Sequence, residues 1–425
     1  MKSVRLHEYT PDLPTLRVRA VIDTQALAEN FVALMEPVRR VSPKTYGIAV
    51  VKADAYGHGI RPCVETLFRV GCHSFAVACP AEAVALRRLL RELGAGDATD
   101  ILVLGYASPE EVALLAEHAV TATLLSDAHA RALLGAAREA GVTLRVHAAL
   151  DTGMNRIGYP SHTEGEQAAT VEALCALFGK GGEAEDGLLL DGLFTHFARS
   201  DEDYDTEMAE GSLTMRQYAR YRRVLDGLTE RGIRPRVCHV CNSAAAVRFP
   251  QVLPEGCMDA VRLGINLYGY GVDLPAFAGS TPTRTHTRPV MRLESAVAHV
   301  HTLLPGESVG YGGDYAADTP RTVATLPLGY ADGWLRAFTG TEVTFHTESG
   351  DYTAPVVGRI CMDQCMADIT GAEEHVHVGD RVILFGGDSG ESVSALAVRA
   401  GTIVYECTCQ VSARVPRVPV SGMDF

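Results

Sequence analysis

The sequence predicts an α/β protein in which a (β/α)8 barrel is followed by a C-terminal all-β domain. The chain has 425 residues, 47% of them hydrophobic, which suits two hydrophobic cores better than one. From Thr45 to Gly269, short apolar runs alternate with stretches of helical periodicity, as in repeated βα units around a parallel sheet. Beyond residue 290 the runs are short, alternate in polarity and are separated by Gly, Pro and Asp, which is typical of antiparallel strands.

The first element along the chain is a strand-like run at Arg17–Thr24, ahead of the first barrel helix. It is surplus if eight other strands close the barrel. We therefore assign residues 1–24 to an N-terminal strand segment that pairs with the C-terminal domain.

Eight strand-like runs follow, and eight parallel strands close a barrel. Helical periodicity between them predicts helices at Ala81–Leu93, Asp127–Ala140 and Glu207–Arg231. Residues 25–275 are assigned to this barrel. Its predicted strands are Thr45–Lys52, Ser74–Cys79, Asp100–Tyr106, Val120–Leu125, Leu144–Asp151, Leu188–Phe197, Arg236–Ser243 and Ala260–Gly269.

A stretch rich in Pro, Gly and Thr at Val272–Arg288 has the composition of a linker. The domain after it, residues 289–425, is expected to be all-β. Its predicted strands are Met291–Thr302, Thr322–Leu326, Glu342–His346, Thr353–Cys361 and Arg381–Leu384. The glycines of Gly179–Gly187 have the wrong spacing for a phosphate-binding loop and predict an exposed loop.

Charge and composition exclude several classes of function. The net charge is −14 and no basic patch is present, which argues against binding to nucleic acid or to an anionic membrane. No apolar run approaches the length of a membrane span or of a signal-peptide core, so a cytoplasmic enzyme is expected. Of the 11 cysteines, Cys238 and Cys241 have the spacing of a metal-binding pair, but no second pair accompanies them. We expect no metal.

Unusual polar residues follow several predicted barrel strands, where the reacting groups of such barrels gather. Lys52 closes an apolar strand, which leaves two interpretations open: its side chain reaches out to solvent, or it forms a Schiff base with a carbonyl cofactor. The small residues of Asn242-Ser243 and Gly264-Ile265 could bring backbone N–H groups to a phosphate. Together they suit a phosphate-bearing cofactor near a lysine.

Many ordered motifs along the chain resemble those of the fold-type III alanine racemases, from about Arg17 to Arg417. The stretch VKADAYGHG at Val51–Gly59 is similar to the lysine signature by which that family holds pyridoxal 5'-phosphate (PLP). The other matching stretches are DTGMNRIG (Asp151–Gly158), THF (Thr195–Phe197), NSAA (Asn242–Ala245), RLGINLYG (Arg262–Gly269), VGYG (Val309–Gly312), PLGYADG (Pro327–Gly333), GRICMDQ (Gly358–Gln364) and GTIVYE (Gly401–Glu406).

The resemblance implies a cofactor, PLP, and a set of residues around it. By it, Lys52 bonds covalently to PLP, Arg156 reaches the phenolic oxygen, His196 lies near the ring and Arg262 faces the pyridine nitrogen. Because a guanidinium stays protonated, Arg262 would donate to that nitrogen and leave it unprotonated, which favours proton exchange over transamination. The matching phosphate-binding positions are Tyr56, Asn242, Ser243, Gly264, Ile265 and Tyr405.

Racemisation needs a base on each face of the α-carbon. The resemblance gives the second base as Tyr311, contributed by the partner subunit of a homodimer and activated through His196 and Arg262. Met362 and Asp363 on the same partner face would border the substrate carboxylate, and Tyr330 would narrow the pocket. Alone, Tyr311, Tyr330 and Tyr405 would be interpreted as ordinary turn or core tyrosines.

One position departs from the family pattern. Many members have a carbamylated lysine two residues before the DTGM motif, where this chain has Ala149. We expect a chloride ion beside Arg156 instead, or contacts from Asp151 or water.

The resemblance implies racemisation of alanine, which would supply D-alanine for peptidoglycan. Alternatives are a serine or broad-specificity racemase and, from other classes, a basic amino-acid decarboxylase or a non-catalytic PLP-binding protein. Tyr311 argues against the decarboxylase. The non-catalytic relatives lack a C-terminal β domain.

Overall fold

The computed structural model describes residues 17–179, 187–201, 212–248, 258–270, 287–387 and 391–422. The chain divides into two compact units. The barrel unit contains Ala28–Ala53 and Val64–Thr287. The C-terminal unit contains Arg288–Phe425 together with Met1–Leu27 and the short segment Asp54–Cys63, so the chain passes between the units at the residues directly after Lys52.

The barrel unit has a strand at each of the eight predicted places. Most residues of these strands are buried, which matches their apolar composition, and β3, β5, β9 and β10 are buried along their whole length. They are β2 (Tyr46–Val50), β3 (Ser74–Val77), β4 (Asp100–Val103), β5 (Ala122–Leu124), β6 (Leu144–Asp151), β8 (Leu188–Phe194), β9 (Val237–His239) and β10 (Ala260–Leu263).

The strands are parallel and run in the orders β10-β2-β3-β4 and β5-β6-β8-β9. Backbone hydrogen bonds join the two sheets at both edges. Thr121 N donates to Ile101 O at 2.8 Å beside β4, and Arg262 N donates to Cys241 O at 2.9 Å beside β10. The ring of strands is therefore closed, as the prediction of a (β/α)8 barrel requires.

Helices connect the strands, and their ends carry recognisable signals. The helix α6 occupies Asp127–Ala140, the range predicted from periodicity; Ser126 caps its start by accepting from His129 N, and Gly141 ends it in the left-handed conformation. The predicted helix at Ala81–Leu93 is α4, and that at Glu207–Arg231 is α8, although residues 202–211 lie outside the described residues. The helices are α1 (Thr24–Val41), α3 (Ile60–Arg69), α4 (Pro80–Glu92), α5 (Val112–Glu117), α6, α7 (Glu164–Leu177), α8 (Leu213–Glu230) and α9 (Ser243–Arg248).

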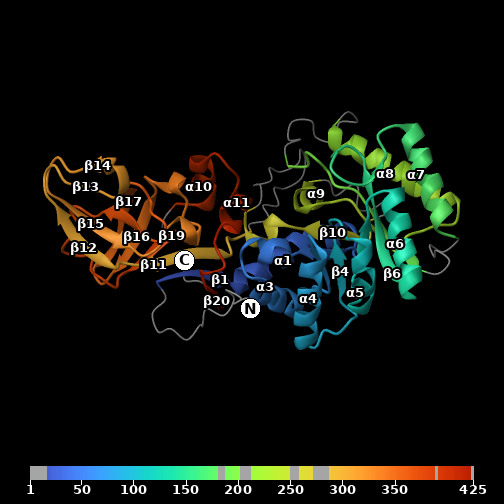
Figure 1. The fold of residues 1–425 in the computed structure, drawn as a ribbon, viewed down its shortest axis with the longest axis horizontal. Helices are drawn as coiled ribbons and strands as arrows, with labels where there is room; N and C mark the ends of the chain where they lie inside the picture. Colours follow the sequence, from blue (N-terminus) through green and yellow to red (C-terminus); the bar gives the residue numbers. More distant parts are fainter. Residues whose placement is uncertain are drawn as a thin grey trace. The chain divides into compact units, whose positions relative to one another are not determined.

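The C-terminal unit is built on a nine-stranded sheet with the order β12-β15-β18-β17-β16-β19-β11-β1-β20. The early strand β1 pairs antiparallel with β11 and parallel with β20, so it lies among strands from the far end of the chain (Figure 1). The strands are β1 (Val18–Asp23), β11 (Met291–Ala296), β12 (His299–Leu303), β15 (Arg321–Leu326), β16 (Glu342–Thr347), β17 (Gly350–Val357), β18 (Cys365–Asp368), β19 (Arg381–Phe385) and β20 (Arg417–Val420).

This unit differs from the prediction in three details. The predicted run Met291–Thr302 forms two strands, because the chain leaves the sheet at Val297 and Ala298. A two-stranded ribbon of β13 (Ser308–Val309) and β14 (Tyr315–Ala316) presents the VGYG motif. Two helices, α10 (Val393–Ala400) and α11 (Val404–Cys409), also belong to the unit, so it is rich in strands without being purely β.

Two predicted loops fall largely outside the described residues. They are the linker at Val272–Arg288 and the loop at Gly179–Gly187. Within the part of the chain that is described, no helix is long and apolar enough to cross a membrane.

Candidate functional site

Lys52 follows the carboxyl end of β2 and is half-buried. The backbone after it is unusual: Ala53, Asp54, Ala55 and Tyr56 have φ between 52° and 56°, and Gly57 has φ 83°. The short helix α2 (Lys52–Tyr56) is therefore left-handed over most of its length. Each L-residue in this conformation costs about 1–2 kcal/mol, so the backbone beside the candidate lysine is strained, as is common at functional sites.

Polar contacts, some exposed and some buried, hold this left-handed turn in place. On the barrel side, the Glu82 carboxylate accepts hydrogen bonds from Ala53 N at 2.7 Å and from Ala78 N at 2.8 Å. In the C-terminal unit, Asp54 Oδ1 accepts from Ile60 N at 2.7 Å. The buried His58 places Nδ1 at 3.0 Å from the carbonyl oxygen of Ala55 and at the same distance from that of Tyr56. Nδ1 therefore carries the proton and donates.

Gly57 ends the turn where no side chain fits. A Cβ atom at this position would lie 2.1 Å from Thr408 O, so Gly57→Ala is expected to lower the free energy of unfolding by about 3 kcal/mol or more. Urea unfolding checks this. Gly401→Ala is the matched control, because Gly401 also has a left-handed φ of 65° but nothing within 4 Å of the added atom. Its expected loss is about 1 kcal/mol, and equal losses in the two variants would contradict the steric argument.

The buried imidazole of His58 makes stability depend on pH. Burial lowers its pKa to about 3, below the value near 6.5 of an unfolded chain. The unfolded state therefore binds the proton first, so stability is complete above about pH 6.5 and falls as the pH drops towards 3. From pH 7 to pH 5 the loss from this residue is about 2 kcal/mol. Urea titrations at the two pH values should show a smaller loss in His58→Asn, and an equal loss would refute the assignment.

Arg262, in β10, is buried and surrounded by acceptors. Its Nη1 donates to His239 Nδ1 at 2.5 Å and to His239 O at 3.1 Å, and its Nη2 donates to Thr195 O at 2.7 Å and to Val240 O at 3.0 Å. Among the described residues, no protein acceptor contacts Nε. Burial lowers the pKa of Arg262 to about 10, so the group remains charged at neutral pH and Nε–H is left to donate to a ligand.

His196 marks the place where several predicted residues meet. Arg262 Nη2 lies 3.4 Å from His196 Nδ1. Burial, followed by the charges of Arg262, Arg156 and Lys52, lowers the pKa of His196 to about 3. Three cationic side chains thus surround one neutral imidazole. An anionic, ring-bearing ligand such as PLP fits this charge, and the Nε–H of Arg262 fits an unprotonated ring nitrogen.

The predicted phosphate residues on adjacent strands also lie close together. Ser243 Oγ accepts a hydrogen bond from Gly264 N at 2.7 Å, and Asn242 Oδ1 accepts from Ala245 N at 3.0 Å at the start of α9. Ser243 and Ile265 are each 5% exposed. In the C-terminal unit, the rings of Tyr56 and Tyr405 lie 5.9 Å apart.

Arg156 is exposed on the loop after β6. Asp151, one of the expected replacements for the missing lysine, points elsewhere: its Oδ1 accepts from Gly153 N and Asn155 N and lies 3.7 Å from His162 Nε2. Among the described residues, no carboxylate lies within ion-pair distance of Arg156. Ala149 itself is buried and offers no charge.

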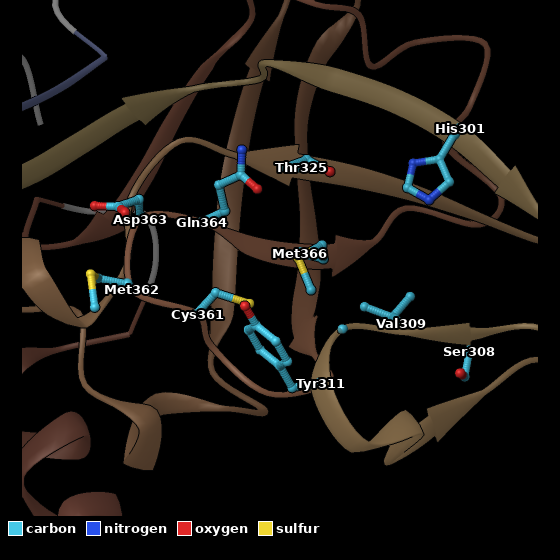
Figure 2. A pocket seen from close by; sticks show the side chains of 11 residues that line it. His301, Ser308, Val309, Tyr311, Thr325, Cys361, Met362, Asp363, Gln364 and Met366 are labelled. Atoms are coloured by element: carbon cyan, nitrogen blue, oxygen red, sulfur yellow. The ribbon is translucent and has the colours of Figure 1, made fainter.

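A cavity of about 710 Å³ in the C-terminal unit brings Tyr311, Met362 and Asp363 together (Figure 2). Tyr311 is 73% exposed, and its hydroxyl points past Cys361 in the view of Figure 2. Tyr330 lies next to the same segment, because Tyr330 N donates to Cys361 O at 3.1 Å. The Asp363 carboxylate accepts from Arg414 Nη2 at 2.6 Å.

Several residues that shape these sites carry no signal in the sequence. Glu82 is one acidic residue of an amphipathic helix, and His239 is one polar residue of a buried strand. Cys361 and Gln364, which line the cavity, stand within a motif but were not singled out. Cys238 and Cys241 are buried and do not form a disulfide, and no cluster of potential metal ligands is present among the described residues.

Comparison with known proteins gives matches along nearly the whole chain. The family model for the alanine racemase N-terminal domain matches residues 22–272, and that for the C-terminal domain matches residues 290–419. Alanine racemase 1 of Clostridium acetobutylicum is 36% identical over 408 residues, covering 95% of this chain and 96% of the relative. The alanine racemase of Desulfovibrio desulfuricans is 37% identical over 405 residues, covering 95% and 98%.

Solved structures are similar over the same extent. An alanine racemase from Clostridium difficile matches with a TM-score of 0.79 at 32% identity, covering 96% of this chain and 97% of that one. A histidine racemase from Leuconostoc mesenteroides matches with a TM-score of 0.76 at 26% identity, covering 96% and 99%.

Proposed function

This chain belongs to the alanine racemase family, and from that membership we infer that it interconverts L-alanine and D-alanine with PLP as cofactor. The observation that carries this conclusion is the match of both family domains together with about 36% identity over 95% of the chain. The cluster of Lys52, Arg156, His196 and Arg262 supports it, since its charge and its remaining N–H donor suit PLP.

For the chemistry, we propose two bases in this chain. PLP, when bound, supplies an electron sink that makes the α-proton of the amino acid acidic. Lys52 Nζ takes or returns that proton on one face, and Tyr311 Oη does so on the other, because inversion needs a donor opposite the acceptor. The lysine also holds the cofactor covalently. Arg262 would donate to the ring nitrogen and keep it unprotonated, which would disfavour transamination.

The residues that hold the cofactor and substrate keep the roles that the resemblance implies. Arg156 would contact the phenolic oxygen of PLP and His196 would lie near its ring. Met362 and Asp363 border the substrate carboxylate, and Tyr330 limits the size of the side chain. The phosphate is held by Tyr56, Asn242, Ser243, Gly264, Ile265 and Tyr405.

We further propose a homodimer in which Tyr311 of one subunit completes the site of the other. The exposure of Tyr311 and of Met362, 73% and 53%, supports this arrangement, because large apolar side chains in one exposed cavity commonly mark a contact surface. The barrel is assigned to residues 25–275, and residues 289–425 with the strand of residues 1–24 form the domain that the partner's site uses. We also propose that the D-alanine formed is used for peptidoglycan and that the enzyme is cytoplasmic.

A small anion is expected to support Arg156. The buried methyl group of Ala149 cannot replace a carbamylated lysine, Asp151 is engaged by the loop backbone, and chloride would supply the missing negative charge. Dialysis into a buffer whose only anions are bulky should lower the racemisation rate severalfold, and added chloride should restore it. Chloride should have little effect on Arg156→Gln. A rate in the wild type that does not depend on chloride would contradict the proposal.

Deuterium incorporation tests the proposed function directly. The PLP-loaded protein is incubated with L-alanine in D2O, and deuterium at the α-carbon is followed together with optical rotation. We expect both to change together. Parallel reactions with L-serine and L-histidine address the second candidate, a racemase of another amino acid, which the similarity to a histidine racemase favours. Bound PLP without exchange from any of the three would instead support a non-catalytic PLP-binding protein.

A further inference from the structure

A line of buried polar side chains leads away from Arg262 through the interior of the barrel. Arg262 Nη1 contacts His239 Nδ1 at 2.5 Å, and His239 Nε2 contacts His147 Nδ1 at 3.0 Å. His147 Nε2 lies 3.8 Å from Asp191 Oδ2. At the far end of the line, Arg236 donates two hydrogen bonds to the Asp191 carboxylate, from Nε at 2.8 Å and from Nη2 at 2.7 Å. These residues come from four strands or their immediate flanks, β6, β8, β9 and β10.

The protonation of both histidines follows from the arginine. A guanidinium only donates, so His239 Nδ1 must accept, and the proton of a neutral His239 must lie on Nε2. That proton points at His147 Nδ1, which must accept in turn, so the proton of His147 also lies on Nε2 and faces the Asp191 carboxylate. Both rings are neutral, since burial lowers the pKa of His239 well below its usual value and lowers the pKa of His147 as well.

Neighbouring residues also pack closely against the two imidazole rings of this line. Gly192 lies opposite His147 in the β6–β8 register, and a Cβ atom on it would stand 2.5 Å from the His147 ring. The Phe194 ring stacks on His239, with centroids 4.9 Å apart and an angle of 9° between the planes. The guanidinium carbon of Arg262 lies 5.4 Å from the centre of the Phe194 ring. These contacts leave little room for either imidazole ring to move.

We propose that His239, His147 and Asp191 are positioning residues that fix the direction in which Arg262 presents its Nε–H. This rests on the proposed function in one respect, that Arg262 donates to the ring nitrogen of PLP. Two neutral rings separate Arg262 from the Asp191 charge, so the guanidinium is oriented without being neutralised by a direct carboxylate partner. Among the described residues, the Asp191 carboxylate is within ion-pair distance of His147 and Arg236.

The expected consequence is control over which reaction occurs. In the side reaction, L-alanine transfers its amino group and two electrons to PLP, which leaves pyruvate and pyridoxamine phosphate. An Arg262 that tilts away from the ring nitrogen allows that nitrogen to be protonated, which strengthens the electron sink and favours this transfer. A disturbed line should therefore raise the ratio of transamination to racemisation, beyond any change in overall rate.

Two substitutions at His147 separate positioning from mere packing. In His147→Asn the amide oxygen can take the place of Nδ1 and accept from His239, whereas His147→Leu leaves the His239 proton without an acceptor. We expect the pyruvate formed per racemisation event to rise about tenfold in His147→Leu and to stay near the wild-type value in His147→Asn. The matched control is His118→Asn, which alters a buried histidine at the end of α5 whose ring, among the described residues, contacts Leu114 O. Equal ratios in the Leu and Asn variants would overturn the proposal.

The second measurement does not depend on catalysis. Nitrogen-15 spectra of histidine-labelled, PLP-loaded wild-type protein at pH 7 report which ring nitrogen carries the proton. The signals of His147 and His239, assigned with the single variants, should both show neutral rings protonated on Nε2. A proton on Nδ1 of either ring, or a charged ring, would overturn the proposal even in a protein that racemises alanine normally. Failure of the wild type to racemise any amino acid would instead reject the proposed function and leave the tautomer result standing.

Discussion

Replacing Lys52 by alanine is expected to reduce racemisation by more than about 10⁴-fold, because the change removes the residue that we propose both as a base and as the point of covalent attachment for the cofactor. The position makes this loss specific to Lys52. The charged side chains that act on His196 together with Lys52 are the two arginines Arg156 and Arg262, and a guanidinium group stays protonated and cannot take over as a base. The rate of α-deuterium exchange from L-alanine measures the effect.

The small number of lysines makes the control for this prediction clean. The chain contains only Lys2, Lys44, Lys52 and Lys180. Borohydride reduction of the loaded wild type should therefore fix PLP on the single peptide that contains Lys52, and Lys44→Ala should retain full activity. Cofactor recovered on the Lys44 peptide, or a Lys52→Ala protein that still exchanges the α-proton, would show that the lysine is misassigned.

Replacing Tyr311 by phenylalanine is expected to lower racemisation by about 10²- to 10⁴-fold while PLP remains bound. The substitution removes only the hydroxyl that we propose as the base on the second face. The ring is 73% exposed at the edge of its cavity, so folding should be unaffected. Absorbance of the bound cofactor and the racemisation rate are measured on the same sample. Tyr315→Phe is the control, because Tyr315 lies in the same ribbon and bonds to Asp368 instead.

Mixing the two inactive variants tests whether the site is shared between subunits. A dimer of one Lys52→Ala chain and one Tyr311→Phe chain contains one site with both wild-type residues and one site with neither. After unfolding and refolding together, about a quarter of the sites should be intact by random pairing. Recovery of roughly that fraction of wild-type activity supports completion by the partner, whereas no recovery would mean that Tyr311 serves its own subunit.

The sequence predicts the barrel well because each strand is a short apolar run with a helical segment after it. All eight strands fall within their predicted ranges. Sequence patterns predict the C-terminal unit less completely: the run at Met291–Thr302 contains no turn residue at Val297 and Ala298, where the chain nevertheless leaves the sheet. The helix at Val393–Ala400 begins with a capping serine, Ser392, a signal that was available but is weak beside the surrounding strands.

The functional residues also differ in how far the sequence could predict them. Resemblance to known motifs supplied Tyr311, whose type and spacing alone are those of a turn tyrosine. Neither periodicity nor motif could have supplied the line from Arg262 to Asp191, because a strand pattern shows which residues face inward but not which of them meet across a barrel. The left-handed turn after Lys52 was equally hidden, since Ala53, Ala55 and Tyr56 have positive φ in it, and alanine and tyrosine ordinarily avoid that conformation.

The turn after Lys52 also has a consequence for the order of folding. Its last part is held by groups near the far end of the chain: Arg417 Nε donates to Gly57 O across 360 positions, and Gly57 packs against the carbonyl of Thr408. Contacts of such long range form late, and during synthesis they must wait until the ribosome has nearly finished the chain. A nascent chain that has completed only its barrel therefore holds the turn through Glu82, Asp54 and His58 alone, and the contacts from Arg417 and Thr408 are added only when the polypeptide is nearly finished.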